Sequence, residues 1–177
     1  MLSYAVTAQQ RDPASFAALV RRHDERLRTL AYKMMLGDRA RMDDVLQDAY
    51  LRAFRSYADF REDADTGTWL HRIVYNACVD DLRSARRRSS LQGALEAATL
   101  RSTASPGPER SVEARDAVLR GLAALPPDQR ATVLLVDGEG FDNVSAAEVL
   151  GVAPGTIASR LSRARAELRR LLTEEER

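Results

Sequence analysis

Apolar residues recur at spacings of three and four along most of this chain. The stripes cover residues 12–37, 38–56 and 68–88, and further stripes cover 112–137 and 141–172. Such spacing places apolar side chains on one face of a helix, and no segment shows the alternation with a period of two that is typical of a strand. The pattern therefore predicts an all-α fold.

Two stretches lack this periodicity. Residues 1–11 show no pattern and are interpreted as a loose arm, whereas residues 89–112 gather Ser, Thr, Gly and Pro. That composition is typical of a flexible linker. The chain is therefore predicted to consist of two small helical domains, 12–88 and 113–177, joined by the flexible linker 89–112.

The last stripe has the boundaries of a helix-turn-helix. Asp142 suits the N-cap of a first helix, and Gly151 can adopt the left-handed conformation that ends it. Pro154 then suits the first turn of a second helix. The inward face of that second helix is predicted to carry Ile157, Leu161, Ala164, Leu168 and Leu171. Residues 141–172 are therefore predicted to end the second domain with this motif.

The opposite face of the second helix is rich in arginine. An α-helix fits the major groove of DNA, where arginine neutralises phosphates and pairs with guanine edges. Residues near the helix N-terminus are expected to reach the bases, namely Thr156, Ser159, Arg160 and Arg163. A charge run alone is equally explained as a solvated surface. The glycine turn before these arginines favours DNA binding.

The charges of the 177-residue chain nearly cancel, with a formal net charge of +1, so its basic character is local. Arginines gather at 83–88 and 160–170, and acids gather at 43–48. The single cysteine, Cys78, excludes an internal disulfide and is expected to be a small core residue. The sequence has no apolar run of about 18 residues and no signal peptide. We therefore expect a cytoplasmic protein without membrane insertion.

The order of these features matches a known family. The stretches that carry the match are DDVLQDAYLRAF at 43–54, TWLHRIVYNACVDDLRSARRR at 68–88, and LPPDQR through to the last helix at 125–172. On these motifs the chain resembles a bacterial extracytoplasmic-function (ECF) sigma factor over residues 15–88 and 112–172. The resemblance implies a protein that initiates transcription together with core RNA polymerase, that is not itself an enzyme, and that uses no cofactor.

By this resemblance the first domain looks like sigma domain 2, which docks on core RNA polymerase. Its second helix has an acidic outer face, on which the docking positions are Asp44, Gln47 and Asp48. The implied partner is core polymerase, through the β′ coiled coil and the β subunit. A charge-complementary contact suits reversible exchange. From composition alone, a solvated acidic surface explains the same residues.

The rest of that domain would recognise the -10 promoter element and help to melt it. The family captures an unpaired base of the non-template strand, and the matching positions are Phe60, Ile73 and Asn76. An aromatic or apolar wall can hold a flipped base, and an amide both donates and accepts hydrogen bonds. Asn76 is also explicable as a residue bonded to its own helix backbone. The phosphates would be tracked by Arg83, Arg86, Arg87 and Arg88.

The second domain looks like sigma domain 4, whose recognition helix reads the -35 element as duplex DNA. The implied contacts are Thr156, Ser159, Arg160, Arg163 and Arg165. Val144, Ser145 and Ala146 replace the acidic pair and isoleucine that are common in the family, and Ala158 replaces a common lysine or arginine. These departures bear on the preferred -35 sequence more than on the fold. Members of the family are usually held inactive by an anti-sigma factor, which is a further expected partner beside polymerase and promoter DNA.

Two other classes of protein compete with this interpretation. A stand-alone regulator would bind an operator through residues 141–172 and would use the N-terminal helices to dimerise or to sense a ligand. It would bind duplex DNA unaided as a symmetric dimer, and it leaves the acidic face and the arginines at 83–88 without a shared purpose. An enzyme is disfavoured, because His23 and His71 stand alone and no catalytic constellation or phosphate-binding glycine loop appears.

Overall fold

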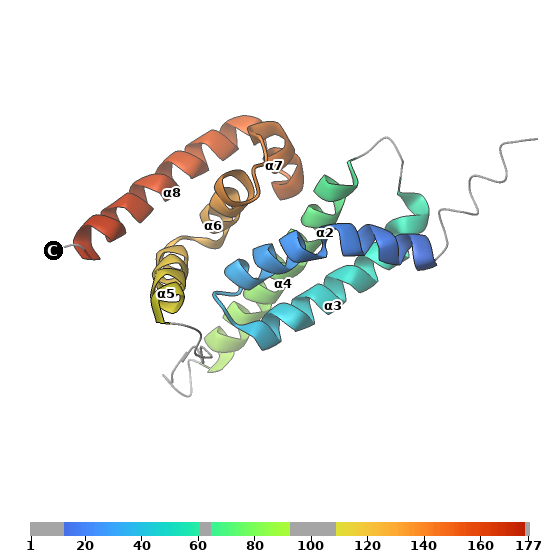
Figure 1. The fold of residues 1–177 in the computed structure, drawn as a ribbon, viewed down its shortest axis with the longest axis horizontal. Coiled ribbons are helices and arrows are strands. Elements are labelled where there is room, and N and C mark those ends of the chain that lie inside the picture. Colours follow the sequence, from blue (N-terminus) through green and yellow to red (C-terminus); the bar gives the residue numbers. More distant parts are fainter. Residues whose placement is uncertain (1–12, 61–64, 93–108, 176–177) are drawn as a thin grey trace, which may run out of the picture.

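The structure is a computed structural model that describes residues 13–60, 65–92 and 109–175. Every long element within these ranges is an α-helix and none is a strand, so the predicted all-α fold is confirmed (Figure 1). The predicted arm 1–11 lies outside the described residues. The helices are α2 (Pro13–Met34), α3 (Arg39–Ser56), α4 (Thr66–Gln92), α5 (Glu109–Ala124), α6 (Pro127–Val133), α7 (Asn143–Leu150) and α8 (Pro154–Glu175).

Helices α2, α3 and α4 pack into one bundle, here called the N-terminal unit. Its core consists of side chains that are at most 2 % exposed, among them Leu27, Leu30, Met34, Leu46, Leu70, Val74 and Cys78. Cys78 is thus the core residue that its position predicts, and burial raises the pKa of its thiol to about 12. Between α2 and α3 the chain reverses at Leu36 and Gly37, whose φ angles of 56° and 88° are left-handed. Asp38 then caps α3 by accepting a hydrogen bond from the Arg41 backbone N–H at 3.0 Å.

Helices α5 to α8 form the C-terminal unit, in which α8 packs against α5, α6 and α7. Its core includes Leu122, Leu125, Ala131, Leu135, Val149, Ile157 and Ala164, none more than 3 % exposed. The sequence predicts a regular helix up to Asp137. The structure instead has a π turn at Leu134–Gly138, and the Phe141 backbone N–H donates to the Leu135 carbonyl at 3.0 Å. A single π turn of this kind interrupts the α-helical hydrogen bonding, and no residue type in the sequence marks it.

Some element boundaries and one side-chain orientation differ from the predictions. α4 begins at Thr66 and continues to Gln92, past the predicted end at residue 88, and α5 begins inside the predicted linker. Residues 93–108 of that linker lie outside the described part of the chain. The helical spacing of apolar residues over 38–56 also predicts Phe54 on the inner side of α3, but Phe54 is 46 % exposed. That expectation is wrong because Ala53, which is fully buried, already fills the inward position of this turn.

The two units pack against each other through α4 and α7 and through α2 and α6. The C-terminal unit, drawn in yellow to red, therefore lies along one side of the N-terminal bundle (Figure 1). Arg130 on α6 lies in this contact and is only 5 % exposed. Its guanidinium donates to the Leu122 carbonyl at 2.8 Å and, across the contact, to the Met34 carbonyl at 2.9 Å.

Candidate nucleic-acid interface

The surface predicted to bind the -10 element starts at the N-terminus of α4. The Asp65 carboxylate accepts hydrogen bonds from the hydroxyl and the backbone N–H of Thr68, at 2.7 and 2.6 Å. The bond from the Thr68 hydroxyl is the larger cause, and the bond from its backbone N–H the smaller, of a pKa of Asp65 below its ordinary value. Because the cap fixes the first turn of the helix, it also fixes the position of Trp69 and, one turn later, of Ile73.

Trp69 connects this first turn to the loop that precedes it. The centroid of its ring lies 4.6 Å from that of Phe60, which is a direct ring contact. Phe60 is thereby held beside α4. Phe60 and Ile73 are half-buried, whereas Asn76 is exposed on the next turn. The remainder of the predicted loop, residues 61–64, lies outside the described part of the chain.

Asn76 presents its amide to the outside of α4. Among the described residues this side chain has no hydrogen-bond partner, so the alternative bond to its own helix backbone is not formed. Arg72 is also exposed and precedes Asn76 by four residues, which places both on one face. Arg72 is not among the positions that the resemblance implies for -10 recognition. Its spacing of four residues from Asn76 marks it as a further candidate for DNA contact.

The C-terminal part of α4 is strongly basic. Arg83, Arg86, Arg87 and Arg88 are all exposed, and none of them forms an ion pair with a described acid. The acids of α4 are neutralised from α3, since Arg52 donates to Asp80 at 2.7 Å and Arg41 donates to Asp81. No acid of the described residues therefore compensates the positive charge at the end of α4, which suits it to binding phosphates.

Helices α7 and α8 form the predicted helix-turn-helix. The Asp142 carboxylate caps α7 by accepting a hydrogen bond from the Ser145 backbone N–H at 2.7 Å. Gly151 ends α7 with a left-handed φ of 64°, and α8 starts at Pro154. In the inward stripe of α8, Ile157, Leu161 and Ala164 are buried, whereas Leu168 and Leu171 near the end of the helix are half-buried. The caps and the stripe that the sequence predicts for residues 141–172 are thus confirmed.

The outward face of α8 divides into paired and unpaired arginines. Arg160 forms an ion pair with Asp128 at 3.2 Å, and Arg165 donates to Asp137 at 2.5 and 3.1 Å. Arg163 is exposed and has no acidic partner among the described residues. Ser159 is exposed beside it and Thr156 is half-buried. The structure therefore leaves Arg163 open for base contacts, whereas acids of the same unit hold Arg160 and Arg165. The exposed Ser159 hydroxyl donates to the Thr156 carbonyl at 3.0 Å, so its oxygen could still accept a hydrogen bond from a base.

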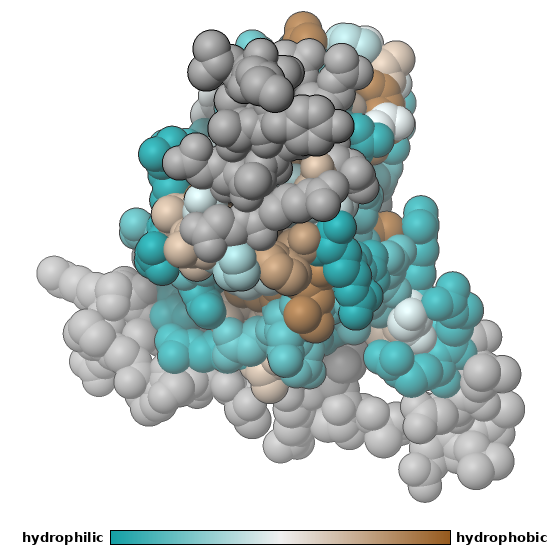
Figure 2. Space-filling view, turned by 90° about the vertical axis from the view of Figure 1, so that its right-hand side faces the viewer, coloured by the Kyte–Doolittle hydropathy of each residue, from teal (hydrophilic) through white to brown (hydrophobic). Residues whose placement is uncertain are grey.

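The predicted docking residues lie on the outer face of α3. Asp44, Gln47 and Asp48 are all exposed, and Asp48 forms an ion pair with Arg52 at 2.6 Å. Exposed apolar residues continue this face, since Leu51 is 50 % and Phe54 46 % exposed. Figure 2 views the end of the molecule where α2 begins and α3 ends, and it shows hydrophobic residues gathered at the centre with hydrophilic residues around them. An apolar patch with a polar rim is typical of a protein interaction surface.

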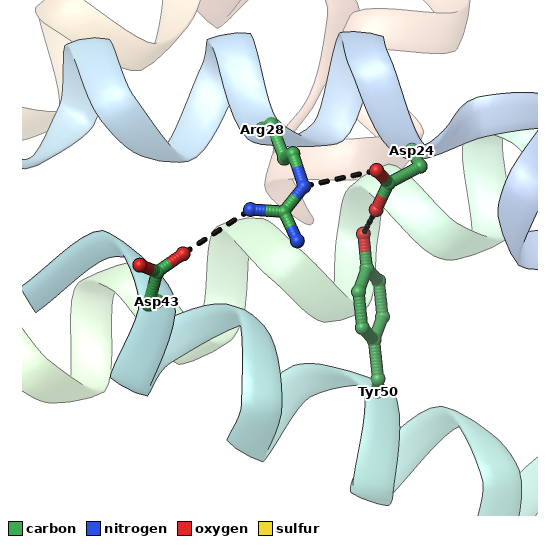
Figure 3. Close-up of polar contacts among 4 residues, drawn as sticks. All are labelled: Asp24, Arg28, Asp43 and Tyr50. Carbon is green, nitrogen blue, oxygen red and sulfur yellow. Dashed lines mark hydrogen bonds and ion pairs between the residues drawn. The ribbon is translucent and has the colours of Figure 1, made fainter. Parts of the chain in front are cut away.

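A polar network holds α2 and α3 together beside this face (Figure 3). Arg28 donates to Asp24 at 2.9 Å and to Asp43 at 3.1 Å, and the Tyr50 hydroxyl donates to Asp24 at 2.7 Å. Burial, and after it the bond to Asp24, raises the pKa of Tyr50. Arg28, Asp43 and Tyr50 of this network line a groove of about 490 Å³, together with Gln47. The network therefore fixes the relative position of the two helices that present the docking face.

Other types of site find no support in the described residues. No group of three or more His, Cys, Asp or Glu side chains there is arranged to hold a metal ion. No described helix combines the length and apolarity needed to cross a bilayer. The surfaces that carry candidate chemistry are therefore α3, α4 and the helix-turn-helix.

Both units match a known family. The model for Sigma-70 region 2 matches residues 19–88, and the model for Sigma-70 region 4 matches residues 115–168. The chain is 44 % identical over 163 residues to the ECF RNA polymerase sigma factor SigM of Mycobacterium tuberculosis, which covers 91 % of this chain and 79 % of the relative. The chain belongs to the ECF sigma factor family. The predicted family is thereby confirmed.

A further relative and two solved structures match over both units. The ECF RNA polymerase sigma-E factor of Escherichia coli is 32 % identical over 167 residues, covering 89 % of this ECF sigma factor and 86 % of the relative. The sigma factor RpoE of Bartonella quintana, solved in complex with the anti-sigma factor NepR, superposes with a TM-score of 0.76 at 26 % identity over 90 % of this chain and 97 % of that one. CnrH, solved in complex with the cytosolic domain of CnrY, gives a TM-score of 0.72 at 26 % identity over 96 % of each chain.

Proposed function

We propose that this ECF sigma factor brings core RNA polymerase to promoters with two separate elements, the -10 element read by α4 and the -35 element read by α8. One observation carries this proposal: a capped helix-turn-helix and a second basic DNA-binding candidate, the end of α4, occur on the same chain. A stand-alone regulator needs only the first of these. Two tethered modules let two weak sites combine through effective concentration.

Docking on polymerase is assigned to α3. Asp44, Gln47 and Asp48 supply its polar part, and Leu51 and Phe54 supply an apolar part that is not among the docking positions implied by the resemblance. A rim of charges steers association and confers specificity, while desolvation of a few apolar side chains supplies most of the affinity. The implied partner face on core polymerase is an amphipathic helical surface with basic residues, as the β′ coiled coil would provide.

Recognition of the -10 element is assigned to the first half of α4. An unpaired base would lie against Phe60 and Ile73, and Asn76 would read its edge through an amide that has no other described partner. Arg83, Arg86, Arg87 and Arg88 would follow the phosphates beyond it. Capture of an unpaired base stabilises the melted strand relative to the duplex, which is how α4 would assist melting.

Recognition of the -35 element is assigned to α8 in the major groove. Arg163 and Ser159 would contact bases directly, since they are exposed and Arg163 has no ion pair with a described residue. Thr156, Arg160 and Arg165 would contact the DNA backbone. To do so, Arg160 would give up its ion pair with Asp128, and Arg165 its ion pair with Asp137. Residues 12–88 then correspond to sigma domain 2 and residues 113–177 to sigma domain 4, with the linker 89–112 between them.

We further infer control by an anti-sigma factor. The support is the likeness of this chain, over 90 % or more of its length, to a sigma factor solved with the anti-sigma factor NepR and to CnrH solved with CnrY. Such a partner would act in the cytoplasm, where polymerase is found.

The experiment that tests the proposed function is run-off transcription with core RNA polymerase on a pool of promoter fragments. Discrete transcripts that appear only when this chain is added support it. The opposite outcome is that core polymerase yields no new transcripts and that the chain alone binds duplex DNA as a dimer. In that case the chain would be a stand-alone regulator. In parallel, Phe54→Ser should reduce capture of core polymerase, whereas Val118→Ser on α5, which alters a side chain that is 53 % exposed, should not.

A further inference from the structure

A cavity of about 430 Å³ lies between α4 and the C-terminal unit. Its volume is within the range of about 300 to 1,000 Å³ that is usual for small-molecule sites. Part of its wall is apolar, formed by Val79 and Leu82 of α4, Leu150 of α7, Val152 after it, and Pro127 of α6. Leu150 is buried, and Val79, Leu82 and Val152 are half-buried. The cavity therefore has an apolar wall that the proposed function does not use.

The same cavity is lined by three arginines and one acid. Arg83 and Arg86 come from α4, one turn apart, and Arg160 comes from α8. Arg83 and Arg86 are exposed and form no ion pair with a described acid. Asp128 pairs with Arg160 through one nitrogen at 3.2 Å, and a guanidinium has five N–H donors. The lining thus carries a net positive charge, with donors left for a further anion.

A tyrosine lies deeper in the cavity than the arginines of α4. Tyr75 lines it and is only 9 % exposed, and its hydroxyl forms no hydrogen bond with a described residue. Burial raises the pKa of Tyr75, and the charge of Arg160 partly offsets this, so the two groups lie within electrostatic reach of each other. A buried hydroxyl without a partner is costly. A ligand in the cavity can therefore accept the hydrogen bond that the protein leaves unmade.

These groups together select the chemistry of the ligand. Guanidinium groups bind phosphate oxygens through paired N–H donors, and a tyrosine hydroxyl adds a further donor. A cation is disfavoured by the excess of positive charge. Free phosphate would leave the apolar wall unused, and a surface that served only DNA phosphates would need neither this wall nor the buried hydroxyl. A molecule with phosphates at one end and a flat ring system at the other matches both parts of the cavity, and nucleotides are built in this way.

We infer that the chain binds a nucleotide in this cavity. Its phosphates lie on Arg83, Arg86 and Arg160, with the Tyr75 hydroxyl as a further donor, and its base packs against the apolar wall. The site itself does not depend on the proposed function. Its consequence for transcription does rest on that function, because a bound nucleotide would occupy arginines that are assigned to promoter DNA and would compete with it.

The test is isothermal titration of the full chain with ATP, pyrophosphate and adenosine as probes. The wall contains no polar group that would read the edge of a base, so ATP can represent nucleotides in general. ATP is expected to bind at least about tenfold more tightly than either fragment, because only ATP fills both parts of the cavity. Equal binding of pyrophosphate and ATP would assign the cavity to inorganic phosphate and would overturn the nucleotide site.

Matched variants separate a defined site from attraction to a basic surface. Tyr75→Phe removes only the hydroxyl and should weaken ATP binding about tenfold, as expected for a lost hydrogen bond to a charged group. Arg86→Ala should weaken it at least about tenfold, since a charge-assisted contact is lost. Arg87→Ala removes the same charge from the next residue, which does not line the cavity, and should change ATP binding less than about twofold at physiological salt.

The outcomes decide between three explanations. Equal losses for Arg86→Ala and Arg87→Ala, or no loss for Tyr75→Phe, would show adventitious binding to charge alone and would overturn the site. Circular dichroism checks the fold of each variant, and if Tyr75→Phe is unfolded, the comparison of Arg86→Ala with Arg87→Ala decides. The expected pattern of ATP binding in a chain that fails the run-off assay would overturn the proposed function alone. Absence of ATP binding in a chain that directs transcription would overturn only the nucleotide site.

Discussion

The two arginine-rich helices differ in how their charges are balanced. At the end of α4, Arg83, Arg86, Arg87 and Arg88 are exposed and have no acidic partner among the described residues. On α8, acids of the same unit hold Arg160, Arg165 and Arg170, at 3.2, 2.5 and 2.7 Å. A loose, uncompensated cluster attracts phosphates without regard to sequence, whereas a paired arginine is held in a fixed position and contributes less net charge. If both helices bind DNA as proposed, α4 would supply most of the affinity and α8 most of the positional discrimination.

The largest effect is expected from removing the α4 cluster. Replacement of Arg83, Arg86, Arg87 and Arg88 by serine should make the slope of log K against log salt shallower by about 3, because each lost phosphate contact removes about 0.7 to 0.9. The measurement is a salt titration of DNA binding. Replacement of the paired arginines on α8 by serine should reduce this slope by less per arginine. These arginines are Arg160, Arg165 and Arg170. The same loss per residue in both sets would remove the distinction between the helices.

The next largest effect concerns discrimination within α8. Arg163→Ala should weaken binding to the -35 element by about 1 to 3 kcal/mol if the side chain contacts a base. Arg165→Ala should weaken this binding less, because the Arg165 guanidinium already donates to Asp137 at 2.5 Å. Binding of promoter and scrambled duplexes separates the two variants. A greater loss for Arg165→Ala than for Arg163→Ala would show that the ion pair does not limit DNA contact.

A smaller effect is expected at the one amide of the -10 surface. Asn76→Ala should lower affinity for single-stranded -10 DNA by about 1 kcal/mol, the typical contribution of a neutral hydrogen bond. Capture of core polymerase and the free energy of unfolding should not change, because Asn76 is exposed and has no described hydrogen-bond partner. A variant that loses polymerase binding to the same degree would indicate a structural asparagine.

The smallest effect is a pH-dependent one at the start of α4. Asp65→Ala should lower the free energy of unfolding by about 0.5 to 1 kcal/mol at neutral pH, since an N-cap is lost. The pKa of Asp65 is lower in the folded chain than its ordinary value. Its ionised form therefore stabilises the fold above the unfolded-state pKa, and this contribution is lost as the pH falls through the lower folded-state pKa. Thermal melts at neutral and acidic pH should show the difference between wild type and variant shrinking in acid, and a constant difference would contradict the charged cap.

The parts of this structure that the sequence predicts are those set by neighbouring residues. Asp142 and Gly151 each act within one turn of their own position, and the helix ends that they predict are confirmed. The inward stripe of α8 follows from spacing alone. For the same reason the family motifs identify the surfaces on α3, α4 and α8 that carry the candidate chemistry.

The parts that the sequence does not predict depend on residues far apart in the chain. Nothing near Arg160 or Arg165 indicates that Asp128 and Asp137 hold them, because these pairs form only after α6 and α8 pack. Arg130 reads as a surface residue, yet its donors are satisfied by carbonyls, one of them from α2. Backbone carbonyls carry no sequence signal, so the contact between the units is visible only in the folded chain.

The length of α4 has one more consequence. Asn76 and Arg87 lie on one uninterrupted helix of 27 residues, and a rise of 1.5 Å per residue places them about 16 Å apart along its axis. That distance is the length of about five steps of one DNA strand at 3.4 Å per step. If Asn76 captures a base as proposed, the helix would set a fixed distance between that base and the first phosphates bound by Arg87, whatever the distance between the two promoter elements.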